Sequence, residues 1–274
     1  MTNASTSAAA ADAAKSYPDV TLEAPFDPAR QSRIGLTLAV AIVLAWIGLH
    51  IYTVFFFPLT WATAPLAVVL VAVQTWLYVG MFIIAHDCMH GSLVPFRPSA
   101  NRLAGRICLF LYAGFFFDEL NRAHHRHHRH SGTAGDPDFD DHPPYGFWRW
   151  FGKFFLEYFS LKQVAILVAV FLVYRFVLGA EQLNALVFWG VPGVLSALQL
   201  FTFGTYLPHK PDTAPFPDRH NARTNDLPAW LSLLTCFHFG YHHEHHLYPT
   251  VPWWRLPAVR GRNVAVDDRN GPQR

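Results

Sequence analysis

Residues 64–90 read APLAVVLVAVQTWLYVGMFIIAHDCMH, an apolar run that ends in two histidines four positions apart. No charged residue interrupts positions 64–86. A helix of roughly 20 apolar residues crosses a hydrocarbon core of about 30 Å, because a helix satisfies its backbone polar groups internally. This stretch therefore predicts a transmembrane helix with a pair of imidazoles at one end.

The apolar residues gather in four such runs instead of spreading evenly along the chain. The runs cover residues 34–57, 64–85, 163–179 and 185–208. Short links join the first run to the second and the third to the fourth, as in helical hairpins. The chain is 52% hydrophobic and 15% charged, a composition that favours a membrane protein. We expect an all-α integral membrane fold with four transmembrane helices in two hairpins.

The segments outside these runs predict peripheral structure. Residues 103–117 are apolar but interrupted by an arginine, so we expect them to be re-entrant or to lie under the bilayer. Residues 147–159 mix aromatic and basic side chains, which is typical of an interfacial helix, although a plain core helix fits equally. Residues 1–32 and 257–274 predict disordered tails on either side of a membrane domain over 33–256.

The basic residues indicate how the chain lies in the membrane. Both hairpin links lack Lys and Arg, which fall in the tails and in the loops 87–162 and 209–274, with Arg175 as the exception. Because cytoplasmic loops carry the excess of Lys and Arg, we expect both termini and the histidine motifs on the cytoplasmic side of the inner membrane. The net charge of only +2 argues against a nucleic-acid partner.

Three short motifs concentrate the histidines. They are HDCMH at 86–90, HHRHH at 124–128 and HHEHH at 242–246. Spacings of three and four residues place side chains on one face of a helix. The residues at these spacings are His86, His90, His124, His127, His128, His242, His245 and His246. We therefore expect a cytoplasmic, histidine-rich helical cap.

The number of imidazoles points to more than one metal ion. Neutral imidazole is a common metal ligand, and eight exceed the four or so that a single Zn²⁺ uses. Two ions are therefore expected. Iron suits nitrogen ligands with open positions for O2, although affinity alone would exclude neither copper nor zinc.

Polar residues near the motifs are candidates for orienting the imidazoles. Asp87 and Glu244 lie inside two motifs, where a carboxylate commonly accepts the second N–H of a ligating histidine. Simple solvated acids are the alternative. Asp118, Asn121, Asp136 and Asp138 flank the second motif and are further candidates.

The three motifs in this order resemble the histidine boxes of the membrane fatty acid desaturase and hydroxylase superfamily. The strings HDCMHGSLVP (86–95), FTFGTYLPHKP (201–211), DRHNAR (218–223) and LTCFHFGYHHEHHLYPTVPWWRLP (234–257) more closely resemble bacterial β-carotene ketolases. This resemblance implies two ferrous ions, O2 as co-substrate and a ferredoxin-like electron donor. It also implies oxidation of the C4 methylene of a β-ionone ring to a ketone, giving echinenone and then canthaxanthin, or astaxanthin from a hydroxylated ring.

The same resemblance implies a ninth ligand. Members of the superfamily often supply one from an NxxxH element, and here residues 205–209 read TYLPH. His209 is therefore expected among the ligands. Thr205 replaces the asparagine, so any contact that this amide makes in relatives is in doubt here.

Other functions remain open from the sequence alone. The histidine boxes do not distinguish a ketolase from a carotenoid hydroxylase or a fatty acid desaturase. A histidine-rich metal transporter would also bind metal in a membrane, but it needs polar groups along a transmembrane path. Apart from His50 and Arg175, the four apolar runs lack them.

Overall fold

The computed structural model describes residues 27–211 and 215–260, whose regular structure is helical, with no strand in these ranges. Three helical stretches are long and apolar enough to cross a membrane: Pro28–Phe56, Ala64–Met89 and Gln182–His209. The first consists of α1 (Pro28–Ile51) and η1 (Tyr52–Phe56), and the second is α2 (Ala64–Met89). The third joins α7 (Gln182–Ala185), η3 (Leu186–Gly190), α8 (Val191–Leu200), η4 (Phe201–Tyr206) and α9 (Leu207–His209).

The third predicted span differs from the expectation. Residues 163–179 fall in α6 (Leu161–Leu172) and η2 (Val173–Val177), which qualify as a span only together with α5 (Phe147–Tyr158), at a bend of 78°. The break arises because Ser160 starts a new helix, where its side chain and that of Gln163 form a capping box. Residues 27–211 and 215–260 thus hold three candidate spans, or four if the bent pair counts as one.

Residues 103–117, expected to be re-entrant or to lie under the bilayer, fall mostly in α3 (Pro98–Ala113), which packs along α2. Gly114 ends it in the left-handed conformation, with φ 67°, and α4 (Phe117–His130) follows directly. Gly105 lets the two helices touch, because a Cβ at this position would collide with the Phe117 ring. The second histidine motif is therefore held close to α2.

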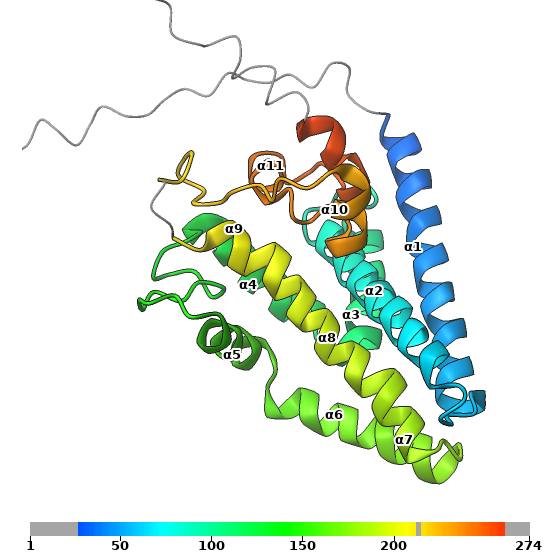
Figure 1. The fold of residues 1–274 in the computed structure, drawn as a ribbon. Helices are drawn as coiled ribbons and strands as arrows, with labels where there is room; N and C mark the ends of the chain where they lie inside the picture. The colour runs from blue at the N-terminus through cyan, green and yellow to red at the C-terminus, as the bar shows by residue number, and fades with distance from the viewer. Residues whose placement is uncertain (1–26, 212–214, 261–274) are drawn as a thin grey trace, which may run out of the picture.

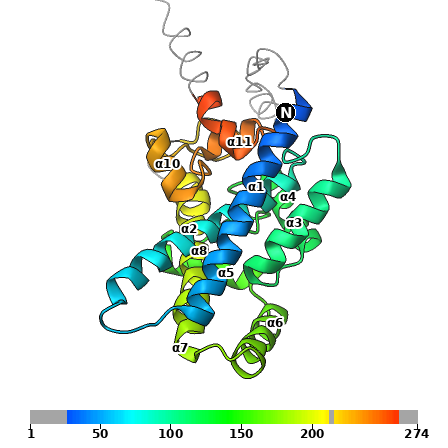
Figure 2. The same ribbon diagram turned by 90° about the vertical axis from the view of Figure 1, so that its right-hand side faces the viewer.

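The ends of the molecule differ in character (Figure 1). The links between α1 and α2 and between α6 and α7 lie at the lower end, and the short helices α9, α10 (Ala229–Cys236) and α11 (His242–Leu247) lie toward the upper end. In the view of Figure 2, α3 and α10 lie on either side of α1 and α2. The 3-10 turn η5 (Trp253–Arg255) follows α11, and residues 256–260, of which 257–260 were expected in the second tail, are helical.

The burial pattern of the long helices fits a lipid-facing exterior. Val40, Leu44 and Val68 are 55%, 62% and 69% exposed, although they are large and apolar. In α2, by contrast, the buried residues gather in the half that ends at Met89. The protein is thus a membrane protein, and its helices bury the end of α2 that carries the first histidine motif.

The predicted tails lie mostly outside the described residues. Residues 1–26 and 261–274 are not described. Residues 28–32, expected in the first tail, form the first turns of α1. The side chain of Asp27 caps this helix by accepting hydrogen bonds from the backbone N–H groups of Ala29 and Arg30.

Candidate metal centre

The end of α2 and the helices α4, α9 and α11 bring all nine predicted histidines together in two groups. We call them group 1 and group 2. Group 1 consists of His86, His90, His124, His128 and His245, and group 2 of His127, His209, His242 and His246. Within each group the candidate ligand nitrogens lie within 4.8 Å of one another. The two groups share a border, where the rings of His128 and His246 stack at 4.3 Å.

Neighbouring residues in a motif serve different groups. His128 Nε2 lies 3.0 Å from His245 Nε2 in group 1, whereas His127 Nε2 lies 3.1 Å from His246 Nε2 in group 2. Consecutive positions on an α-helix are about 100° apart, since a turn takes about 3.6 residues. Each HxxHH motif therefore faces two sites at once.

The imidazole nitrogens within group 1 lie as close together as ligands around a shared metal ion would. His128 Nε2 also lies 3.1 Å from His124 Nε2, which in turn lies 2.7 Å from His90 Nε2. A neutral imidazole carries one N–H, so these contacts cannot all be good hydrogen bonds. His86 Nε2 in group 1 and His209 Nε2 in group 2 are buried and have no hydrogen-bond partner among the described residues. The donor set therefore fits one metal ion in each group.

Burial keeps the imidazoles in the form that binds metal. It lowers the pKa of His124, His242, His245 and His246 well below the usual range. At neutral pH these side chains are uncharged, and each offers a lone pair.

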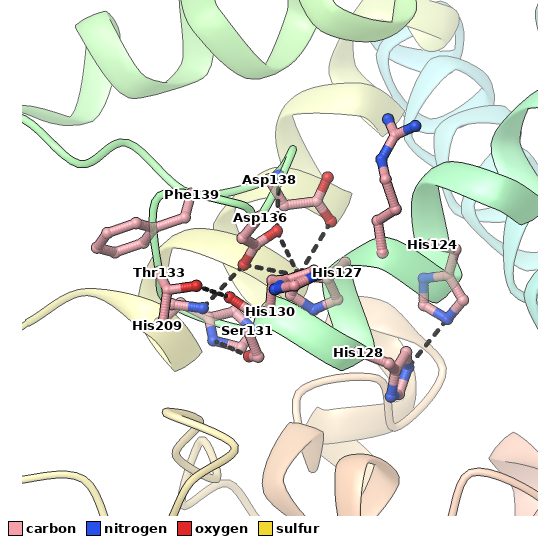
Figure 3. Close-up of polar contacts among 12 residues, drawn as sticks. His124, His127, His128, His130, Ser131, Thr133, Asp136, Asp138, Phe139 and His209 are labelled. Atoms are coloured by element: carbon pink, nitrogen blue, oxygen red, sulfur yellow. Dashed lines mark hydrogen bonds and ion pairs between the residues drawn. The ribbon is translucent and has the colours of Figure 1, made fainter.

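Two histidines of group 2 are oriented through their second nitrogen. His127 Nδ1 lies 2.9 and 3.0 Å from the two carboxylate oxygens of Asp136 (Figure 3). His209 Nδ1 donates to the carbonyl of Asn221 at 2.7 Å. Both bonds leave Nε2 with the lone pair, directed into group 2.

The carboxylate also changes the basicity of His127. Burial alone would lower its pKa, but Asp136 and Asp138 outweigh burial and hold the pKa above its usual value. For Asp136, burial would raise the pKa, but His127 holds it below the ordinary value. The result is a more basic imidazole, and a more basic ring is a stronger metal ligand.

A cavity of about 450 Å³ adjoins both groups. His86 and His124 of group 1 and His127 and His242 of group 2 lie in its wall. The remaining wall is mostly apolar and includes Phe82, Phe115, Phe154, Phe171, Trp189 and Phe239. The cavity therefore suits a hydrophobic molecule with one end at the histidines.

The sequences of known proteins align with this chain over most of its length. The family model for fatty acid desaturases matches residues 59–177 and 158–273. The chain belongs to the fatty acid desaturase family. A β-carotene ketolase of Paracoccus sp. (strain PC1) is 51% identical over 229 residues, covering 83% of this chain and 92% of the relative. One of Paracoccus sp. (strain N81106 / MBIC 01143) is 49% identical, covering 82% and 92%, and one of Haematococcus lacustris is 37% identical, covering 87% and 82%.

Three of the carboxylates expected to orient the imidazoles form hydrogen bonds or ion pairs with other residues. Asp87 accepts a hydrogen bond from the backbone N–H of Trp253 at 3.3 Å. Glu244 accepts one from the Thr224 hydroxyl, and Asp118 binds Arg106 at 2.7 Å on the surface. These three carboxylates thus serve partners other than the imidazoles.

The two uncharged candidates each have a buried polar side-chain group or a buried side chain. Asn121 has a buried side-chain oxygen with no hydrogen bond among the described residues, and Thr205 is buried and lines the cavity. Asp136, one of the acids that flank the second motif in the sequence, is the candidate whose carboxylate holds an imidazole of the two groups. A turn brings it back to His127, with the N–H of Gly132 donating to Asp136 at 2.9 Å. The turn-forming string SGTAGDPD at 131–138 was the available clue.

Proposed function

We propose that this protein is a β-carotene ketolase, a membrane oxygenase that converts the C4 methylene of a β-ionone ring to a ketone. Its relatives of 51%, 49% and 37% identity bear this name, and each aligns with more than four-fifths of the chain. The observation that carries the chemistry is the apolar cavity with members of both histidine groups in its wall. A hydrocarbon ring placed there lies beside both groups.

In this proposal the nine histidines hold two iron ions, one in each group. Iron, when bound, supplies the activation of O2 that oxidation of a C–H bond requires. The chain contributes neutral imidazoles, the Asp136 carboxylate that orients His127, and an apolar wall that excludes water from the ring. β-Carotene would give echinenone and then canthaxanthin, and zeaxanthin would give astaxanthin.

The membrane arrangement and the electron donor belong to the same proposal. The two hairpins would be α1 with α2, and α6 with the helix from α7 to α9. Placing the histidine cap in the cytoplasm, at the inner membrane, follows from the basic loops around it. Arg122 and Arg129 are exposed on α4 and would attract an acidic donor such as a ferredoxin.

Expression in a host that makes β-carotene tests the activity. Pigment analysis by HPLC should show canthaxanthin and some echinenone. Zeaxanthin would show a hydroxylase, and unchanged β-carotene would favour a desaturase of other lipids or a metal transporter. The His245→Ala variant serves as the inactive control.

A further inference from the structure

A carboxylate lies in the wall of the cavity, which is mostly apolar. Asp138 belongs to the loop between α4 and α5, its side chain is 13% exposed, and the residue lines the same cavity as His127. β-Carotene is a hydrocarbon and offers no hydrogen bond to this group. The carboxylate is nevertheless a hydrogen-bond acceptor that a polar group on a molecule in the cavity could use.

The surrounding structure holds Asp138 firmly. Its N–H donates to Asp136 at 2.8 Å, and its carbonyl accepts from Trp150 Nε1 at 2.7 Å. The hydroxyl of Tyr158, on α5, donates to Oδ1. A group fixed at this many points can position a ligand without first being ordered itself.

The second carboxylate oxygen of Asp138 makes only a long contact, with His127. Oδ2 lies 3.6 Å from His127 Nδ1, which is longer than a normal hydrogen bond. The single N–H at that nitrogen is already directed to the carboxylate of Asp136 (Figure 3). Oδ2 can therefore accept a hydrogen bond from a molecule in the cavity, next to a histidine of group 2.

The proposed reaction generates a suitable donor. A methylene becomes a ketone through two oxidations at the same carbon, and the product of the first is an alcohol. We propose that Asp138, oriented by Tyr158, accepts a hydrogen bond from the hydroxyl of the half-oxidised ring and retains that ring for the second oxidation. This inference rests on the proposed ketolase function. The hydrocarbon substrate and the ketone product both lack a donor, so Asp138 distinguishes the intermediate from each of them.

The ratio of alcohol to ketone tests this role. Asp138→Asn keeps the size of the side chain but replaces one oxygen by a donor group. We expect the ratio of 4-hydroxy to 4-keto pigments to rise about tenfold or more, the scale of a hydrogen bond to a charged group. Asp140→Asn is the matched control, since Asp140 is a buried carboxylate of the same loop that pairs with Arg149 at 2.7 Å. It should leave the ratio unchanged.

Binding without turnover provides a second measurement, should the variant yield little pigment. Quenching of tryptophan fluorescence in the purified protein compares β-carotene with 4-hydroxy-β-carotene. The wild type should prefer the alcohol about tenfold, and Asp138→Asn should lose this preference while still binding β-carotene. An unchanged product ratio, or an unchanged preference in binding, would overturn the role of Asp138. A wild type that makes no ketone would instead overturn the proposed function.

Discussion

Group 1 and group 2 are built from the same motifs but are held in different ways. Group 1 has five histidines, two of which come from the buried end of α2. Group 2 has four, and two of these bond through Nδ1 to loop atoms, at Asp136 and at the carbonyl of Asn221. Helix packing therefore positions much of group 1, whereas group 2 depends on the loops that follow α4 and α9. Group 2 is the more easily disturbed.

The largest effect is expected from removing a histidine of group 2. His209→Ala leaves three imidazoles in that group, so we expect ketone formation to fall at least about a hundredfold, more than the usual loss of an outer partner. Iron content should fall from two atoms per chain toward one. His90→Ala, which leaves four imidazoles in group 1, should retain more iron.

His243→Ala is the matched control for any histidine substitution. His243 lies on α11 between members of group 2 and pairs with Asp218 at 2.8 Å, outside both groups. Its removal should leave iron content unchanged. Equal iron loss from His209→Ala and His243→Ala would contradict the assignment of the groups.

A smaller effect is expected from the carboxylate that supports group 2. Asp136→Asn weakens the bond that orients His127, and loss of such a partner typically costs about 10- to 100-fold in metal affinity or activity. Titration of the metal-free protein with Fe²⁺ measures this cost. If one site weakens while the other keeps its affinity, the contrast between the groups is supported; equal weakening of both would argue against it.

A substitution in the cavity wall tests where the substrate lies without changing either histidine group. Gly193 lines the cavity, and a Cβ there would meet nothing within 4 Å, so we expect Gly193→Leu to be accommodated and to take up space in the cavity. Ketone yield should drop about tenfold or more through misplaced substrate, with iron content unchanged in both groups. Gly48→Leu is the control, because Gly48 also has free space around it but lies on the exposed face of α1. Full activity of Gly193→Leu would place the substrate elsewhere.

The smallest effect is expected at Asp118, near group 1 in sequence. Its carboxylate pairs with Arg106 at 2.7 Å and with Arg102 at 3.4 Å on the surface. Exposed ion pairs of this kind contribute little to stability. Asp118→Asn should therefore keep ketone yield within about twofold of the wild type, since a change of this size in stability leaves the site intact. A large loss would show that this acid acts on the imidazoles after all.

The sequence alone predicted the histidines that gather, because their spacing on helices is a local property. It did not predict how they divide, since His127 and His128 point to different groups only once α11 packs against α4. The role of Asp136 depends on a turn that returns the chain to His127, and helical spacing does not encode such a turn. The break before the third span was not predicted, because hydropathy does not detect the capping box at Ser160.

Metal analysis of the purified, active wild-type protein tests the central claim most directly. Iron measured by mass spectrometry against quantified protein should give two atoms per chain, with one lost in His209→Ala. A fully active preparation that holds a single iron, or that works equally well without iron, would contradict the account of two adjacent histidine groups.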